Sequence, residues 1–407
     1  MLEIDPRLWW DEITGPSHLV RAIASELRDG RSVFLSVPDD LPWRKQMRSA
    51  VEQNLRENGP NLLVDYIDCQ TDCPDCRESA DVADLLLSRY ARAEVKNGYR
   101  RSSGQSIQQY ILKNQILKDR VIWVKGMAPH HVKSWMDYCR AYHTKSSSDG
   151  LFVIECHEDA SRRRTATGMK LLFYKDYVGY HDALLFNHFF AAPMRRSPEW
   201  KQYLATVAAQ LCGCDVELSC SLLARLADGQ EHNPIQLLQE IAQTEHYEMR
   251  SHAEFLDAQH PFVMIRSGQP EGMSQGLWKA QLQVLFPLLE YERIEFISHF
   301  QEAIWAGLHE AYQDPDPKRP GPHYITQLGE RVYEPYDVEL GTLYRMNHLR
   351  MYRDNALYLL YLSEERDRER LGLLRDIRNS IAHMSPCSSE IVAKFLDRYP
   401  YPWQSSC

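Results

Sequence analysis

The chain has 407 residues, which is enough for two or three domains with separate cores. Its hydrophobic content of 44% and charged content of 25% are those of a folded globular protein and exclude a disordered or fibrous chain. The formal net charge of −9 argues against non-specific coating of nucleic acid, because phosphate neutralisation needs clustered lysine and arginine.

The sequence predicts neither a membrane span nor a secretory signal. No run of about 18 apolar residues occurs, and the most apolar stretch, ALLFNHFFAA, is short and is interrupted by Asn187 and His188. The N-terminal stretch MLEIDPRLWWDE contains early acids and lacks a basic segment followed by an apolar one. We therefore expect a cytoplasmic protein, in which most of the ten cysteines stay reduced.

Residues 1–190 alternate between short apolar runs and amphipathic stretches, a pattern typical of an α/β domain with a parallel sheet. We expect helices at 18–30, 43–58, 106–118 and 129–143. We expect strands at 31–38, 61–69, 120–126, 150–156 and 176–186.

This order of elements resembles the nucleotide-binding core of AAA+ and STAND-type P-loop ATPases. The resemblance implies a phosphate loop of the form G-x4-G-K-[ST] after the first strand. The corresponding stretch DDLPWRKQ (39–46) has Asp39 and Arg44 in place of both glycines, and Gln46 in place of the magnesium-binding hydroxyl. Only Lys45 matches, and the two aspartates would repel a triphosphate.

The strand expected to end in metal-binding carboxylates ends instead in Lys125 and Gly126. We therefore interpret residues 1–190 as a degenerate NTPase-like domain, for which we expect no cofactor and no ATP hydrolysis; nucleotide binding without turnover stays open. An unrelated α/β domain is the alternative.

Three cysteines follow the second expected strand, in DCQTDCPDCRE. The spacing Cys69-x3-Cys73-x2-Cys76 matches the three-thiolate pattern that holds an iron–sulfur cluster in radical S-adenosylmethionine enzymes. Those enzymes consist of repeated β/α units and usually carry an aromatic residue where this chain has Asp75. Zinc would need a fourth ligand, and the pair Cys212 and Cys214 is distant in sequence. An incidental or loop-structural role, zinc binding and a cluster all remain open.

Helical patterns dominate from residue 191 onward. We expect helices at 199–213, 217–229 and 233–246, which form a helical subdomain over 191–265. Gly268, Pro270, Gly272 and Gly276 predict a linker. Long helices at 277–312, with a bend at Pro287, at 337–365 and at 366–384 then predict a bundle over 266–407.

The last of these helices carries the most specific polar pattern in the chain. On a helix from 374 to 384, Leu374, Ile377, Ile381 and Met384 form one apolar stripe. Asn379 and His383 lie together on the far side, and Arg378 lies between the stripe and the polar face. Pro386 stops the helix, which places His383 in its last turn.

A helical bundle that ends in RNSIAH resembles the HEPN superfamily, whose motif is R-x4-6-H, often with Asn, His or Asp after the arginine. Arg378, Asn379 and His383 match this motif position by position, and the resemblance covers about 130 residues. It implies metal-independent RNA cleavage, with the arginine as phosphate clamp and the histidine as acid–base group, at a two-fold interface between two copies.

Two functions from different classes follow. The first is a HEPN ribonuclease that cleaves RNA and needs no cofactor or metal. Its N-terminal domain would sense a trigger or bind a protein partner, as in toxins or antiphage defence effectors. The second is a non-catalytic dimeric scaffold, in which Arg378 pairs with Glu364, Asp367 or another acid and His383 only caps the helix.

Overall fold

The computed structural model describes residues 4–58, 62–100, 104–142, 150–157, 168–227, 232–244, 256, 258–269, 271–311, 324–326, 329–348 and 359–403. They form two compact units. The first consists of Met1–Phe186, Cys212–Leu218 and Glu245–Val263, and the second of Asn187–Leu211, Ser219–Thr244 and Met264–Cys407. The division into three domains with boundaries after residues 190 and 265 stays a prediction.

The first unit contains a five-stranded sheet in which all strand pairs are parallel, in the order β2-β3-β4-β1-β5. Its strands are β1 (Ser32–Val37), β2 (Leu63–Asp68), β3 (Arg120–Lys125), β4 (Leu151–His157) and β5 (Met169–Phe173). Strand β1 is buried along its whole length, because a parallel sheet with helices on both faces exposes neither face of its inner strands. The expected parallel α/β architecture is thereby confirmed.

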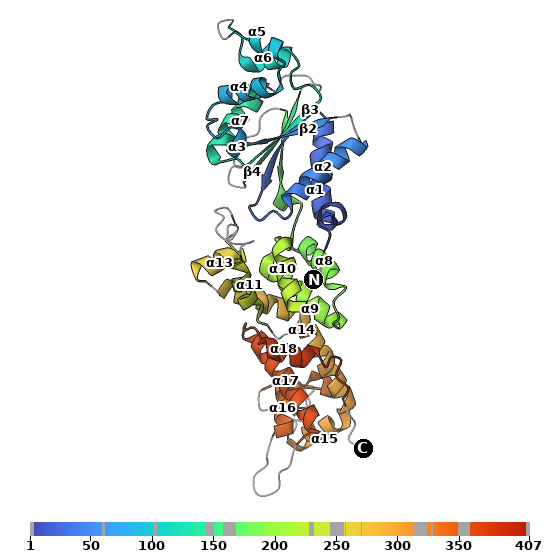
Figure 1. Ribbon diagram of the computed structural model, residues 1–407. Coiled ribbons are helices and arrows are strands. Elements are labelled where there is room, and N and C mark those ends of the chain that lie inside the picture. Colours follow the sequence, from blue (N-terminus) through green and yellow to red (C-terminus); the bar gives the residue numbers. More distant parts are fainter. Residues whose placement is uncertain are drawn as a thin grey trace. The chain divides into compact units, whose positions relative to one another are not determined.

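Helices cover both faces of this sheet. Figure 1 shows α1 (Thr14–Arg28) and α2 (Arg44–Asn58) on one face, and α3 (Cys69–Asp72), α4 (Ser79–Tyr90) and α7 (Pro129–Tyr142) on the other. Two further short helices, α5 (Ala93–Gly98) and α6 (Ile107–Lys113), complete the connection from α4 to β3. The strand order reverses around β1, so the carboxyl end of β1 is the edge at which open α/β sheets bind ligands.

One expected strand is wrong. The segment predicted as a strand at 176–186 instead contains the end of a 3-10 turn, η4 (Tyr174–Asp176), and the start of helix α8 (Tyr180–Ala191). The fifth strand precedes it, at Met169–Phe173, where it pairs with β1. Residues 180–191 are rich in apolar residues on every side, so their periodicity could not distinguish a buried helix from a strand.

The second unit is mainly helical. Helices α8, α9 (Pro198–Cys212), α10 (Val216–Ala227) and α13 (Pro261–Ser267) each contain residues of both units. The helices wholly within the second unit are α11 (Pro234–Ala242), α14 (Glu271–His299), α15 (Gln301–Ala311), α16 (Leu340–His348), α17 (Glu365–Ala382) and α18 (Ser389–Leu396). A two-stranded hairpin, β6 (Tyr324–Ile325) with β7 (Arg331–Val332), and a 3-10 turn, η5 (Pro335–Asp337), precede α16.

The predicted linker is wrong in part. Gly268 ends α13 with a φ of +65°, but Gly272 and Gly276 lie inside α14. Gly276 is a packing residue, because an added Cβ would lie 3.2 Å from the carbonyl oxygen of Gln210 and from Leu211. Pro287 also lies inside α14, and the helical path is interrupted at Phe300, between α14 and α15.

The predicted helix at 337–365 is shorter than expected. Helix α16 ends at His348, residues 349–358 lie outside the described part of the chain, and 359–364 are not helical. Within the described residues, no helix is both long and apolar enough to cross a membrane.

Candidate functional site

The carboxyl end of α17 carries the Arg378, Asn379 and His383 motif. Leu374, Ile377 and Ile381 are buried, which confirms most of the expected apolar stripe. Met384 does not belong to it: the helix ends at Ala382, and Met384 adopts a φ of +57° with 61% of its surface exposed. The stripe therefore stops one turn earlier than the sequence predicts.

A Schellman motif ends this helix. The Ser385 amide donates to the Ser380 carbonyl at 2.9 Å, and the Met384 amide donates to the Ile381 carbonyl at 3.1 Å. This motif needs a left-handed residue at the position of Met384, where glycine is usual because other residues are strained there. His383 is consequently the C-cap residue rather than part of the last turn.

Helix α14 fixes this turn from the other side. The indole of Trp278 donates to the Ile381 carbonyl at 2.8 Å, and the side-chain amide of Gln281 bonds both to the Cys387 carbonyl, at 3.0 Å, and to the Cys387 amide, at 2.6 Å. The backbone around His383 is therefore held in place, although the His383 side chain is exposed.

Arg378 and Asn379 are half-buried on the solvent side of α17. The Arg378 guanidinium donates to Glu339 Oε2 at 2.9 Å, and the two side chains are 38% and 57% exposed. Its partner is thus neither Glu364 nor Asp367; the latter is buried and accepts a hydrogen bond from Tyr401 at 2.7 Å.

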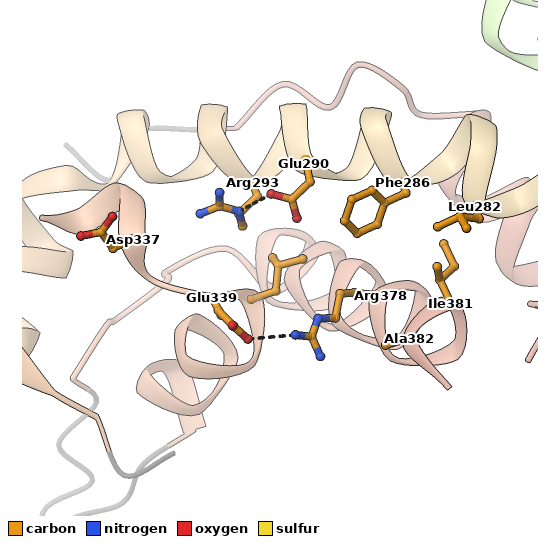
Figure 2. Close-up of a pocket in the computed structure, with 10 residues that line it drawn as sticks. Leu282, Phe286, Glu290, Arg293, Asp337, Glu339, Arg378, Ile381 and Ala382 are labelled. Atoms are coloured by element: carbon orange, nitrogen blue, oxygen red, sulfur yellow. Dashed lines mark hydrogen bonds and ion pairs between the residues drawn. The ribbon is translucent and has the colours of Figure 1, made fainter. Parts of the chain in front are cut away.

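A groove of about 420 Å³ lies beside Arg378, between α14, α16 and α17 (Figure 2). Two arginines and three carboxylates line it, together with apolar side chains from α14 and α17. These lining residues are Leu282, Phe286, Glu290, Arg293, Asp337, Glu339, Leu340, Arg378, Ile381 and Ala382. Arg293 pairs with Glu290 at 2.8 Å, so each arginine of the groove already contacts a carboxylate. Asn379 and His383 are not among the lining residues.

A buried ion pair holds α17 against α14 and α18. Arg370 bonds to Glu292 at 2.9 and 2.5 Å, and both side chains are at most 3% exposed. Arg370 also donates to the carbonyls of Lys394 and Phe395 near the end of α18, at 3.2 and 3.1 Å. Burial raises the pKa of Glu292, and the hydrogen bond from Arg370 opposes that shift. This network positions the helix that carries the motif.

In the first unit, the loop after β1 is filled by side chains of the chain itself. The Arg44 guanidinium donates to the carbonyls of Pro38 and Asp39, at 2.6 and 3.2 Å, and to Glu155 Oε1 at 3.1 Å. Asp39 in turn lies 2.6 Å from His157 Nδ1 at the end of β4. The aspartate and arginine at the expected glycine positions therefore stabilise the loop by contacts that glycines could not make.

The backbone amide of the residue just before α2 also has an acidic partner. The Trp43 amide donates to Glu217 Oε1 at 3.1 Å, so a carboxylate of the chain lies where a helix N-terminus would bind an anion. The Lys45 side chain is exposed. Lys125, at the end of β3, pairs with Asp68 at 2.5 Å, and Gly126 has a φ of +67°.

Among the described residues of the first unit, side chains of types that can bind metals gather in two places. Cys69, Cys73 and Cys76 are all buried and belong to one hydrophobic cluster on the α7 side of the sheet. Asp40, Asp215 and His260 converge so that one ligand atom from each lies within 4.8 Å of the others. Sequence reasoning missed this second cluster, because Asp40 is distant from the other two in sequence, Asp215 and His260 are 45 residues apart, and the three share no spacing pattern.

Comparison with known proteins gives no family for this chain. No family model matches it, and no curated protein matches it. Among solved structures it is similar to the Orc1 protein of Aeropyrum pernix in complex with DNA, with 10% sequence identity and a TM-score of 0.30, covering 93% of this chain and 87% of that chain. At so low a TM-score the likeness does not define the fold, which follows from the strand order and register of the first unit itself.

Proposed function

We propose that the second unit cleaves RNA without a metal ion, through Arg378, Asn379 and His383 in two copies of the chain. The observation that carries the proposal is the placement of these three residues. They lie off the buried stripe of α17, are partly or fully exposed, and sit at a helix end that α14 holds rigidly. The sequence resemblance to HEPN ribonucleases supports the same assignment.

The chemistry suits these residue types. RNA supplies its own nucleophile, the 2′-hydroxyl, so the protein needs to move protons and to stabilise charge on the phosphorane. Histidine titrates near neutrality and suits acid–base work, whereas arginine is permanently charged and can hold a phosphate with two hydrogen bonds. We assign proton transfer to His383, phosphate binding to Arg378, and support of the phosphate to Asn379.

A second copy would complete this site. One α17 supplies only one Arg–His pair, and the groove beside Arg378 exposes Leu282 by 36% and Phe286 by 39%. Exposed apolar side chains beside polar ones are typical of surfaces that bind another protein. We therefore propose a homodimer in which the α17 ends of two copies face each other.

We further propose that the first unit regulates this activity and does not hydrolyse ATP. The Arg44 contacts in the loop after β1 and the Glu217 carboxylate at the start of α2 support this proposal, since both occupy positions that a triphosphate would need. A trigger or protein partner recognised by the first unit would then release the nuclease, as in a toxin or an antiphage defence effector.

Purified full-length protein tests the cleavage proposal directly. Wild type should cleave RNA in EDTA and leave 2′,3′-cyclic phosphate or 3′-phosphate ends, and Arg378→Ala and His383→Ala should each abolish cleavage. His348→Ala and Arg225→Ala are matched controls, because His348 is an exposed histidine and Arg225 forms an exposed pair with Glu240 at 3.0 Å. Cleavage that needs magnesium, or that survives in both site variants, contradicts the assignment.

A non-catalytic interaction protein is the second candidate, and the Arg378–Glu339 ion pair favours it, since a paired guanidinium needs no substrate. Glu339→Gln separates the two functions. It should strengthen RNA binding and cleavage if Arg378 is a phosphate clamp, and it should change only dimer affinity if the groove is an interface. Overexpression provides a test in cells: wild type should slow growth, alone or with a trigger, and His383→Ala should relieve it.

A further inference from the structure

Arg375 lies on the face of α17 that carries the proposed cleavage residues. With about 3.6 residues per turn of helix, it precedes Arg378 and Asn379 by one turn. Side chains three and four positions apart are neighbours on a helix surface. The buried residues Ile377 and Ile381 point to the other side of the helix. A third polar side chain is therefore placed beside the two that we assign to the phosphate.

An aromatic ring of α16 supports the Arg375 guanidinium. Its central carbon lies 3.6 Å from the ring centre of Tyr344, which is van der Waals contact between two flat groups. The same ring lies against α17 at Gly372, where an added Cβ would touch it at 3.5 Å. His348 stacks on Tyr344 as well, with ring centres 4.1 Å apart and planes inclined by 22°. Arginine and histidine cannot share one face at these distances, so both faces of the tyrosine are covered.

A neighbouring carboxylate occupies one hydrogen-bonding edge of Arg375. Its Nε and Nη2 donate to Asp376 Oδ1 at 3.0 and 2.5 Å. With that edge bonded to Asp376 and one face against Tyr344, the plane of the guanidinium has a fixed orientation. The Arg375 side chain is still 28% exposed. The face turned away from Tyr344 is the part of the group that a ligand can reach.

A guanidinium held in this way suits a nucleobase better than a phosphate. Phosphates bind arginine through its N–H edges, and Asp376 already takes one of them. Nucleobases instead stack on the flat faces of aromatic rings and guanidinium groups. Only an unpaired base can do so, because a base within a duplex is already stacked between its neighbours.

We propose that Arg375 stacks on an unpaired base next to the phosphate held by Arg378, and that the substrate is therefore single-stranded RNA. This inference rests on the proposed cleavage function and adds its substrate class. Tyr344 is a positioning residue, since it acts by holding the plane of Arg375. Every base has a flat face, so stacking selects unpaired RNA and discriminates weakly among the four bases. His348 is separated from this contact by the tyrosine ring.

Binding of 2′-O-methyl RNA to the full-length protein tests stacking without cleavage, because this RNA lacks the nucleophile. Wild type should bind a single strand more tightly than the duplex of the same sequence, measured by fluorescence anisotropy. A single strand that contains 2-aminopurine should lose fluorescence on binding, as a stacked base does. Arg375→Lys keeps the charge but not the plane, so it should weaken single-strand binding about two- to fivefold and reduce this quenching. Arg345→Lys is the matched control and should behave as wild type, because Arg345 is an exposed arginine of α16 outside the stack.

The outcomes separate this inference from the proposed cleavage. Equal quenching and affinity in Arg375→Lys and wild type overturn stacking, whether or not unmodified RNA is cleaved. A duplex that binds wild type as tightly as the single strand also overturns it, and this comparison needs no variant to fold. Selective, quenched binding of the single strand without any cleavage of unmodified RNA supports the stacking contact and counts against the nuclease. Absence of RNA binding by wild type overturns both.

The salt dependence of binding distinguishes stacking from a further phosphate contact. Arg375→Lys and Tyr344→Leu change no charge, so the slope of log Kd against log salt should equal that of wild type. Tyr344→Leu should nevertheless reduce the 2-aminopurine quenching, because Arg375 loses the ring that fixes its plane. Unchanged quenching in Tyr344→Leu contradicts the positioning role of the tyrosine.

Discussion

Replacement of Arg370 by methionine should cost the second unit more stability than any exposed charge does. The substitution removes two bonds to Glu292 and two bonds to carbonyls near the end of α18. It also removes the guanidinium from the faces of Phe395 and Tyr401, whose ring centres lie 4.6 and 5.2 Å away. The Glu292 carboxylate, 1% exposed, would keep only the Tyr401 amide, at 3.3 Å.

The size of the loss in stability follows from the Glu292 carboxylate, which stays buried without its partner. Removal of one partner from a buried ion pair costs about 3–5 kcal/mol, because the remaining charge is left without compensation. For a unit of this size the loss corresponds to a fall in Tm of roughly 6–20 °C, at about 2–4 °C per kcal/mol. Replacement of both partners, Arg370→Met with Glu292→Leu, should recover most of the loss, since methionine and leucine fill the space without a charge.

Differential scanning calorimetry of the full-length variants measures these changes. Arg225→Met is the control: its pair with Glu240 is in the same unit, but the side chains are 37% and 63% exposed, so its loss should stay below about 1 kcal/mol. An Arg370→Met variant no less stable than Arg225→Met would contradict the expected cost of the buried, unpaired carboxylate. A double variant less stable than Arg370→Met alone would contradict it as well.

Three other substitutions have defined outcomes. Met384→Gly should raise the free energy of unfolding by about 1 kcal/mol, because glycine adopts the left-handed conformation without strain; a lower urea midpoint would contradict this. The pKa of Glu292 is raised in the folded state, so the protonated carboxyl favours folding. This contribution to the free energy of unfolding is complete below the unfolded pKa and is lost as pH rises through the folded pKa. Glu292→Gln should therefore flatten the fall of stability above about pH 4.5, measured as Tm against pH. Wild type should show no ATP turnover above background, and Lys45→Ala should leave nucleotide binding unchanged by calorimetry; hydrolysis abolished by Lys45→Ala would show that the phosphate loop is misassigned.

The sequence predicts the first four strands well, because each is a short apolar run bounded by charged or turn residues. The clearest case is RVIWVK: we expect a strand at 120–126, and β3 spans Arg120–Lys125. The sequence predicts the fifth strand in the wrong place, since MKLLF is only five residues long and the following apolar helix gives a stronger signal. The predicted linker is wrong for a different reason: Gly272 and Gly276 provide close packing inside α14 rather than flexibility.

The motif residues at the end of α17 could be placed on a polar face from periodicity alone. Their partners could not, because Glu339 lies 39 residues before Arg378 and no local pattern links the two. The same limit explains why Glu217 was not anticipated at the start of α2, 174 residues away from Trp43. Helical phase predicts which side chains share a surface, whereas contacts between distant segments depend on the folded chain.

If Arg378 is the phosphate clamp that we propose, the Arg378–Glu339 pair sets how strongly a phosphate must compete for the guanidinium. With side chains 38% and 57% exposed, such a pair contributes about 0.2–1 kcal/mol, because water screens both charges. A phosphate that displaces Glu339 therefore loses at most about a factor of five in affinity, since 1.4 kcal/mol corresponds to a factor of ten. Rising salt weakens both the Arg378–Glu339 pair and a phosphate contact at Arg378, because ions screen exposed charges. The Glu339 carboxylate would therefore exchange readily with a phosphate of the proposed substrate.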